Sequence, residues 1–544
     1  MDKAQPNRQG ADASRQELLA QAFNLLQQGR STEAMHLGDA LLTAHPGDAE
    51  VLFLASETRL AMEDPAAALG FICAAVEAAP GQVPLLLKKA DNLIMLRRRK
   101  DARQVAVDAT AVAGDDGGAL WRIGKVYSRC DDPAGALPLY LRAQRTMGSH
   151  PALLHDLAMA RFFTGDIAGA EQDVEALLAA APNTAHALYL RSTLRRQTEA
   201  RNHVEDLQRR LVAGFAGVAE RTNCLFALAK ELEDLGQSDA SFAALTEAAA
   251  LKRQNMTYNA AAERASIDSI RVEYTKQVMQ ADVPGYGEEG AIFIVGMPRT
   301  GTTLLERMLG RHSDVGSAGE LLDFGQLLAS ASRTSHAAHP GSTIVEASRK
   351  IDFAALGRDY MVGAREAAGG SKVFIDKMPV NYIYCGLIKK ALPNARIIHV
   401  VRDPMDSCYA VYKTLFNQAY PFSYDFDELA DYYATYHRMM RHWHEVMPAE
   451  IIDVHYEELV TDTEAQARRV LAWCGLDWQD AVLSPSHDDK PSTTASAAQV
   501  REPVYTSSLE KWRRYEASLT PLVDRLAAAG IVNAEVGKAR PDTV

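Results

Sequence analysis

The residues with the clearest chemical potential lie in a glycine-containing loop in the second half of the chain. An apolar run, 291–295, leads into a loop from Gly296 to Thr303, and the pattern of an amphipathic helix follows. A loop between a buried strand and a helix presents backbone N–H groups and the positive end of the helix dipole to an anion. We therefore predict a phosphate site formed by Pro298, Arg299, Thr300, Gly301, Thr302 and Thr303.

This loop has the G-x-x-x-x-G spacing of a Walker A motif, but Thr302 stands where that motif has its lysine. A nucleoside triphosphatase uses this lysine on the β- and γ-phosphates. Arg299 lies inside the loop instead, and its guanidinium, with the hydroxyls of Thr302 and Thr303, could clamp a single terminal phosphate. A P-loop nucleotide kinase with an altered Walker lysine remains an alternative interpretation.

A second anion site is predicted further along the chain. Residues 395–401 read as another buried strand, and Arg402 follows directly. Asp403 suits the N-cap of the next helix and Pro404 its first position, so Ser407 falls in the first turn. Open α/β sheets bind ligands at the carboxyl ends of their strands. Arg402 and Ser407 are therefore expected to converge on an anion.

Together, these two sites resemble the nucleotide-binding motifs of sulfotransferases. The segment 298–304 resembles their 5′-phosphosulfate loop, and 400–407 resembles their 3′-phosphate motif. Further segments have counterparts in the same order, namely 376–379, 454–459, 496–504 and 511–512. The sequence is most similar to the bacterial tetratricopeptide-repeat (TPR) sulfotransferases, and its catalytic half also resembles the tyrosylprotein sulfotransferases. The resemblance implies 3′-phosphoadenosine 5′-phosphosulfate (PAPS) as the co-substrate.

The resemblance also assigns roles to individual residues. It implies that Glu320 is the general base that takes the proton of the acceptor hydroxyl. It implies that Lys377, assisted by Ser496, stabilises the departing nucleotide, and Arg299 shares that charge. Tyr456 is expected to line the nucleotide pocket. A loop folding over the nucleotide, 484–515, is expected to add Gln499, Val500 and Lys511.

The expected partners follow from this chemistry. The acceptor is a hydroxyl of a peptide, a protein or a small molecule, and a peptide tyrosine is one candidate. A carbohydrate or small metabolite is equally permitted by the sequence. No metal is expected, since arginine and lysine can neutralise a phosphosulfate without Mg²⁺.

The first half of the chain is organised differently, as a repeat of 34 residues. Leucine recurs at Leu18, Leu52, Leu86, Leu120 and Leu154. A small residue follows four positions later, at Ala22, Ser56, Ala90, Gly124 and Ala158, and alanine recurs at Ala34, Ala68, Ala102, Ala136 and Ala170. Small residues let two helices approach closely, and the period and pattern resemble the tetratricopeptide repeat. Such helix pairs stack into a solenoid.

We therefore predict a multidomain chain of α and α/β classes. An N-terminal TPR α-solenoid covers 14–255, a connector covers 256–290, and a P-loop-like α/β sulfotransferase domain with a central parallel sheet covers 291–530. The concave face of the solenoid is expected to bind substrate or a protein partner, although it could serve only as a scaffold. An interaction protein with a degenerate catalytic half is the remaining alternative.

Composition supports an ordinary globular protein of 544 residues, with 47% hydrophobic and 24% charged residues. A net charge of −12 argues against nucleic acid as a partner, so any site for a polyanion must be built locally. The six cysteines form no C-x-x-C motif, which indicates a reducing compartment. No signal peptide or membrane span is recognised. The sequence thus predicts a cytoplasmic protein without a membrane partner.

Overall fold

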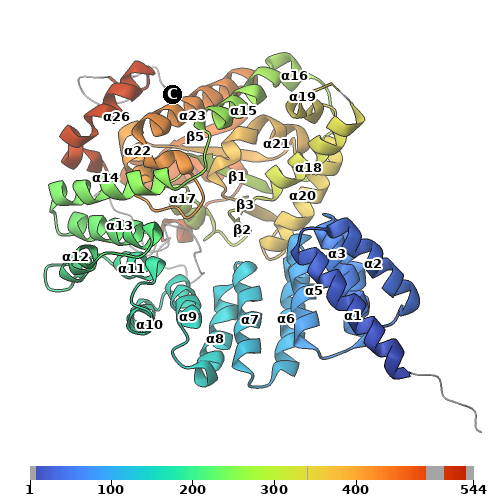
Figure 1. Ribbon diagram of the computed structural model, residues 1–544. Helices are drawn as coiled ribbons and strands as arrows, with labels where there is room; N and C mark the ends of the chain where they lie inside the picture. Colours follow the sequence, from blue (N-terminus) through green and yellow to red (C-terminus); the bar gives the residue numbers. More distant parts are fainter. Residues whose placement is uncertain (1–7, 340, 485–505, 507, 534–544) are drawn as a thin grey trace, which may run out of the picture. The chain divides into compact units, whose positions relative to one another are not determined.

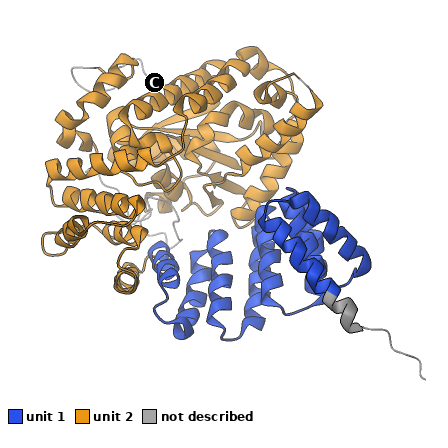
Figure 2. Cartoon of the chain, in the orientation of Figure 1, with its two compact units in different colours: residues 1–164 blue, residues 165–544 orange. Residues whose placement is uncertain are grey.

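The computed structural model describes residues 8–339, 341–484, 506 and 508–533. The chain divides into two compact units, 1–164 and 165–544 (Figure 2). The predicted limits at residues 255 and 290 differ from this division, which groups the last predicted repeats with the sheet. Compactness alone does not decide where a repeat array ends, so the predicted domain limits stay a prediction.

The first unit consists of helices joined by short loops, and consecutive helices pack against each other. Its helices are α1 (Arg8–Gln27), α2 (Ser31–Ala44), α3 (Ala49–Ala61), α4 (Pro65–Ala78), α5 (Val83–Met95), α6 (Arg99–Ala113), α7 (Gly117–Arg129), α8 (Pro133–Met147) and α9 (Pro151–Thr164). Four helix pairs, each spanning one 34-residue repeat, are thereby confirmed, and α9 begins the fifth repeat.

The repeated small residues lie at the contacts between these helices. Ala22, Ala34 and Ala68 have no exposed surface, and neither has Ser56. A Cβ atom on Gly124 would lie 2.4 Å from the ring of Tyr140, so a larger residue would force α7 and α8 apart. The helix pairs therefore depend on small side chains at these positions, because close-packed interiors leave no room for extra methylene groups.

The second unit begins with further helices. These are α10 (Ile167–Ala180), α11 (Ala185–Thr193), α12 (Val204–Ala213), α13 (Val218–Asp234), α14 (Ser238–Gln254), α15 (Ala260–Glu273) and α16 (Lys276–Gln280). The segment predicted as a connector, 256–290, thus contains α15 and α16. Helix α15 packs against a long helix of the sheet region, α23 (Phe426–Val446).

A five-stranded parallel sheet forms the centre of this unit. Its strands are β1 (Ala291–Gly296), β2 (Val315–Gly319), β3 (Val373–Asp376), β4 (Arg396–Val401) and β5 (Ile451–His455). Their order across the sheet is β2-β3-β1-β4-β5, and every neighbouring pair is parallel. The predicted α/β fold with a central parallel sheet is confirmed.

Helices and short 3-10 turns surround the sheet (Figure 1). The helices are α17 (Thr302–Leu309), α18 (Asp323–Ala338), α19 (Ile344–Ser348), α20 (Phe353–Ala367), α21 (Cys385–Ala391), α22 (Pro404–Tyr412), α23, α24 (Tyr456–Thr461), α25 (Thr463–Cys474) and α26 (Glu516–Ala528). The 3-10 turns are η1 (Pro379–Tyr384), η2 (Pro421–Tyr424), η3 (Asp480–Leu483) and η6 (Lys511–Tyr515).

Both faces of the sheet are buried, as a parallel sheet requires. On β1, Ile292 and Ile294 join a core cluster with Leu305 of α17. Phe293 points to the opposite face, where its ring stacks on Tyr360 with centroids 5.4 Å apart. This alternation explains why 291–295 is apolar at every position. No helix among the residues described above is long and apolar enough to cross a membrane.

Candidate active site

The carboxyl ends of all five strands carry residues of the predicted site. The glycine-containing loop follows β1, and the other strands are followed by Glu320, Lys377, Arg402 and Tyr456 respectively. Since neighbouring strands lie about 4.8 Å apart, parallel strands bring such residues to one edge of the sheet. Strands β2 and β3 lie on one side of β1, and strands β4 and β5 lie on its other side. This reversal of strand order is the topology that opens a ligand crevice.

The loop after β1 adopts a conformation that only certain residues tolerate. Arg299 has φ 67° and Gly301 has φ 102°, both in the left-handed region. A Cβ atom on Gly301 would lie 2.4 Å from the ring of Tyr456, so the glycine also lets Tyr456 cover the loop. The hydroxyl of Thr300 donates to the carbonyl of Met297 at 2.8 Å and closes the turn.

Helix α17 continues from this loop. Its first two residues, Thr302 and Thr303, are buried. The predicted strand–loop–helix is therefore present, with the N-terminus of α17 facing the end of the sheet where the other strand-end residues lie. Backbone N–H groups at this position suit an anionic ligand.

A buried lysine and two carboxylates form one end of the site. Lys377 is completely buried, and its Nζ makes an ion pair with Oε1 of Glu320. The same Nζ lies 3.6 Å from Oε2 of Glu306, which belongs to α17. Glu306 is held in turn by the hydroxyl of Ser317, which donates to its Oε1 at 2.6 Å. The lysine ammonium thus lies between two carboxylates, and the side chain of Glu320 keeps 38% of its surface exposed.

A bulge in β2 places Glu320 beside Lys377. The pairing of β2 with β3 shifts register between Ser317 and Gly319. Gly319 has φ 75°, a conformation that favours glycine. Its carbonyl accepts a hydrogen bond from the backbone N–H of Lys377 at 2.9 Å. This bond fixes the strand ends together, so the two side chains that follow them meet.

Asp376 supports this end of the site from within the core. Tyr360 donates to its Oδ2 at 2.6 Å, and the side-chain amide of Asn381 donates to the same oxygen at 3.2 Å. Burial raises the pKa of the Asp376 carboxyl to about 7 despite these donors. Asp376 therefore anchors the end of β3 next to Lys377.

Arg402 forms the other end of the site. It is 8% exposed, and its guanidinium donates to the carbonyls of Arg299 at 3.1 Å and Ser508 at 2.7 Å. Its guanidinium carbon lies 4.7 Å from the ring centre of Tyr456, a cation–π contact. Among the described residues, its buried Nε has no hydrogen-bond partner. The fully buried Ser407 donates from its hydroxyl to the carbonyl of Arg402 at 3.3 Å.

The segment around residue 510 is fastened to this end. Asp406 accepts the backbone N–H of Glu510 at 2.7 Å and that of Trp512 at 3.4 Å. The hydroxyl of Tyr456 lies 2.8 Å from that of Ser508. These bonds bring Lys511, the first residue of η6, to the site.

Three predicted site residues, Ser496, Gln499 and Val500, lie outside the described residues. Conversely, Glu306, Asp406 and Ser508 were not predicted. The sequence shows Asp406 only as an acidic residue in the first turn of α22, and its bonds to the backbone of Glu510 and Trp512 arise from the tertiary structure. Nothing in the sequence indicated Glu306, because its role depends on the distant Lys377.

A cavity of about 580 Å³ is lined in part by Arg402 and Asp406. Its lining includes His399, His444 and Asp453, a group within the described residues whose ligand atoms lie close enough to hold a metal ion. Asp453 Oδ1 lies 2.8 Å from Nδ1 of His399 and 3.1 Å from Nε2 of His444. These are hydrogen-bond lengths, and the bond to Asp453 raises the pKa of His444. The predicted absence of a metal remains a prediction.

Comparisons with known proteins point to sulfotransferases. A family model described as the sulfotransferase family matches residues 291–480. An uncharacterized protein of Aquifex aeolicus is 32% identical over 314 residues, which are 56% of this chain and 41% of that protein. Protein-tyrosine sulfotransferase 1 of Danio rerio is 26% identical, over 43% of this chain and 71% of its own length. The Drosophila melanogaster protein-tyrosine sulfotransferase is 24% identical, over 46% and 53%.

Among solved structures, the sulfotransferase domain of the Synechococcus PCC 7002 olefin synthase is 20% identical, covering 43% of this chain and 91% of that domain with a TM-score of 0.32. The family match confirms that residues 291–480 resemble the sulfotransferase family. The chain spans about two fifths of the first relative and about half of the Drosophila protein.

Proposed function

We propose that the protein transfers the sulfuryl group of PAPS to the hydroxyl of an acceptor. The observation that carries this proposal is that Lys377 pairs with Glu320 while Arg402 bonds to a phosphate loop that lacks the Walker lysine. Each of these side chains follows a different strand of one parallel sheet. The family match to residues 291–480 supports the same reaction.

The residues present suit a nucleotide with an anion at each end. Gly301 leaves room for Tyr456 and the loop to close around a ligand, since any side chain there would strike the tyrosine ring. Beside Tyr456, Arg402 keeps one buried nitrogen without a partner among the described residues. The phosphosulfate would lie on the loop with Arg299, and the 3′-phosphate would lie at Arg402 and Ser407.

In the proposed reaction, the acceptor oxygen forms a bond to sulfur while the bond from sulfur to the bridging phosphate oxygen breaks. Glu320 accepts the proton of the acceptor hydroxyl, and its partly exposed carboxylate leaves it reachable. Lys377 and Arg299 stabilise the negative charge that develops on 3′-phosphoadenosine 5′-phosphate (PAP) as it leaves. The proposal also keeps Ser496 as a residue that assists Lys377, and Gln499 and Val500 as residues that bind the nucleotide.

The proposal extends to the acceptor and to the cellular setting. The names of the animal relatives favour a protein tyrosine as the acceptor hydroxyl, presented by the repeat array. We also propose a reducing, cytoplasmic setting, because all six cysteines are free thiols.

A thermal-shift comparison tests the donor. PAP is expected to raise the melting temperature of the full chain without magnesium, because arginine and lysine supply the counter-charge. ATP with or without Mg²⁺ is expected to have little effect, since Thr302 replaces the Walker lysine. Stabilisation by Mg-ATP but not by PAP would favour a nucleotide kinase, and stabilisation by neither would indicate an interaction protein. Formation of a sulfated tyrosine peptide from PAPS then tests the acceptor.

A further inference from the structure

The cavity of about 580 Å³ is lined by three side chains of the types that bind transition metals, His399 of β4, His444 of α23 and Asp453 of β5. His399 and Asp453 are directly paired in the register of the two neighbouring strands. Their strand neighbours Ile398 and Val454 belong to the core cluster of the other face. Because side chains alternate along a strand, His399 and Asp453 point together toward His444.

Both imidazoles bond to the same carboxylate oxygen. Oδ1 of Asp453 lies 2.8 Å from Nδ1 of His399 and 3.1 Å from Nε2 of His444. The three ligand atoms all lie within 4.8 Å of one another. Zinc holds imidazole nitrogen and carboxylate oxygen at about 2.0–2.2 Å, so its ligand atoms lie about 3 Å apart. The three side chains therefore have nearly the spacing that a site of two histidines and one carboxylate requires.

The other ring nitrogen of His399 has a partner that suits a metal ligand. Its Nε2 contacts the hydroxyl of Tyr436, which also belongs to α23. A histidine that binds a metal usually donates its second ring N–H to such a group, which fixes the tautomer and the orientation of the ring. With its proton on Nε2 and accepted by Tyr436, His399 presents the lone pair of Nδ1 toward Asp453.

The charges around the cavity favour a cation. Among the described residues that line it, four carboxylates besides Asp453 face two guanidiniums, namely Asp403, Asp406, Glu457 and Glu510 against Arg402 and Arg441. A surplus of one charge in a cleft raises the local concentration of the opposite ion. The side chains of His444 and Asp453 keep 31% and 21% of their surface exposed, so an ion can reach them.

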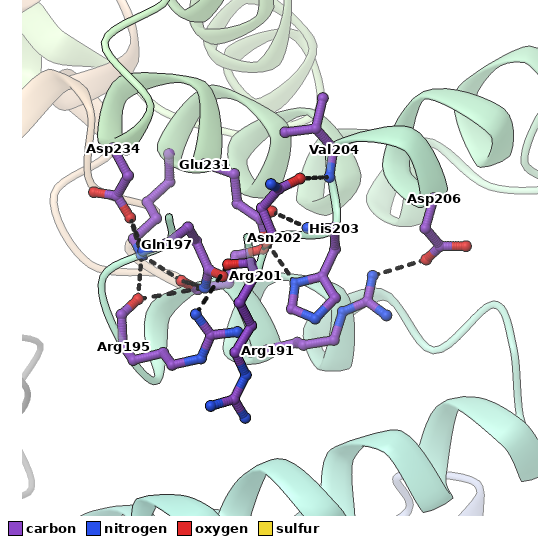
Figure 3. A network of polar contacts seen from close by, with 12 residues as sticks. Arg191, Arg195, Gln197, Arg201, Asn202, His203, Val204, Asp206, Glu231 and Asp234 are labelled. Carbon is purple, nitrogen blue, oxygen red and sulfur yellow. Dashed lines mark hydrogen bonds and ion pairs between the residues drawn. The ribbon is translucent and has the colours of Figure 1, made fainter. Parts of the chain in front are cut away.

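A second histidine–carboxylate contact in the same compact unit shows what distinguishes this cluster (Figure 3). Nδ1 of His203 lies 2.9 Å from Oε1 of Glu231, which also accepts the hydroxyl of Ser192 at 2.6 Å. The other oxygen of Glu231 accepts the backbone N–H of His203 at 2.5 Å, and Glu231 has no exposed surface. Both oxygens of Glu231 therefore serve the protein's own donors, whereas Asp453 bonds to two imidazoles that line a cavity.

We propose that His399, His444 and Asp453 bind one divalent transition-metal ion of the zinc class. Imidazole suits zinc and its neighbours, whereas Mg²⁺ prefers carboxylates and water. Three protein ligands leave at least one coordination position, and the cavity offers room there for water or an anionic group. The ion would join β4, α23 and β5. The proposed transfer of sulfuryl groups needs no metal, so this site goes beyond the proposed function.

Calorimetric titration of the full chain with Zn²⁺ tests the site, after a chelator and any affinity tag have been removed. The wild type is expected to bind one equivalent, and Mg²⁺ at the same concentration should give no binding heat. H444Q and D453N each remove a ligand and should bind Zn²⁺ at least about 100-fold more weakly. Y436F removes only the outer partner of His399 and should weaken Zn²⁺ about tenfold.

H442Q is the matched control. His442 lies two residues before His444 on α23, and its Nε2 contacts the carbonyl of Tyr274 at 3.0 Å instead of Asp453. This variant should bind Zn²⁺ with the affinity of the wild type. A loss in H442Q as large as that in H444Q would mean that any histidine change in α23 has this effect, and would overturn the proposal.

The outcomes separate this inference from the proposed function. Absence of Zn²⁺ binding by the wild type, or equal affinities of the wild type, H444Q and D453N, would overturn this inference alone. Zinc binding that these variants lose, without PAP binding in the presence of a chelator, would support the site and overturn the proposed function. Should D453N fail to fold, H444Q decides, because its side chain is partly exposed.

Discussion

At one end of the candidate site a single ammonium lies between two carboxylates, whereas at the other end a guanidinium bonds to backbone carbonyls and an aromatic ring. Lys377 has Glu306 and Glu320 as partners. The nearest carboxylate to Arg402 is that of Asp406, at 3.9 Å, and Asp406 already accepts two backbone N–H groups. The Lys377 ammonium is therefore paired more closely with carboxylates than the Arg402 guanidinium is.

This difference suits the two tasks of the proposed reaction. A group that exchanges a proton or stabilises a developing charge is most effective when its partners are already fixed, because little then rearranges during the reaction. A group that holds a phosphate throughout must instead attract it, which requires surplus positive charge. Changes at the Lys377 end should thus affect turnover, and changes at the Arg402 end should affect nucleotide affinity.

The largest effect is expected for E320Q. Loss of the general base should lower kcat by about 10³-fold while PAP affinity stays within about threefold of the wild type. Rapid-quench transfer assays and calorimetry would measure the two quantities. E306Q is the matched control, since Glu306 faces the same ammonium at 3.6 Å and has no proposed contact with the acceptor. Equal losses in both variants would mean that Glu320 acts only through Lys377.

A smaller loss is expected for K377M. Without the ammonium, charge on the departing phosphate is less stabilised, and kcat should fall about 10²-fold with little change in KM for PAPS. K372M serves as the comparison, because Lys372 is exposed just before the other end of β3. A K377M variant whose KM alone rises would place this lysine among the anchoring residues and remove the contrast between the two ends.

R402M should invert the pattern. Losing charge-assisted bonds worth about 1.5–3 kcal/mol should weaken PAP about 10- to 100-fold, with kcat at saturating PAPS nearly unchanged. R396M is matched to it, because Arg396 begins the same strand at the opposite end of the sheet and also makes a cation–π contact, with the ring of Trp473. Normal PAP affinity in R402M would show that the 3′-phosphate binds elsewhere.

The last prediction concerns stability, rather than catalysis or binding, at the Lys377 end. The pKa of Asp376 is about 7 in the folded protein and near 3.8 when unfolded, so the folded state holds a proton that the unfolded state releases between these values. Wild-type stability should fall by about 1.4 kcal/mol per pH unit from this group as pH rises from 4 to 7. D376N has no carboxyl group to titrate at this position. Its melting temperature should therefore change less between pH 5 and pH 7 than that of the wild type.

Much of the fold could be predicted because it depends on local pattern. The spacing of Ala34 and Ala68 predicted the helix pairs, and both alanines are fully buried. The apolar run before Gly296 predicted the central strand, since a strand with both faces covered is apolar throughout. Arg402 was predicted at a strand end because Asp403 and Pro404 mark the start of the following helix.

The features of the site that could not be predicted depend on contacts between residues that are far apart in the sequence. Glu306 reads as one polar residue of an amphipathic helix, and only the strand order brings it to Lys377. The bulge at Gly319 was not foreseen either, because it follows from the pairing of β2 with β3. The contact of Glu233 with Lys413 spans the predicted boundary between solenoid and catalytic domain.

By itself, the sequence determined the helix repeats, the strand–loop–helix and the residue types of the proposed donor site, because each is fixed by neighbours a few positions away. Only the tertiary structure decided which charges meet. Glu320 and Lys377 are 57 positions apart, and Glu233 and Lys413 are 180 apart. Their pairing depends on strand order and helix packing, which are set by the whole core rather than by any local segment.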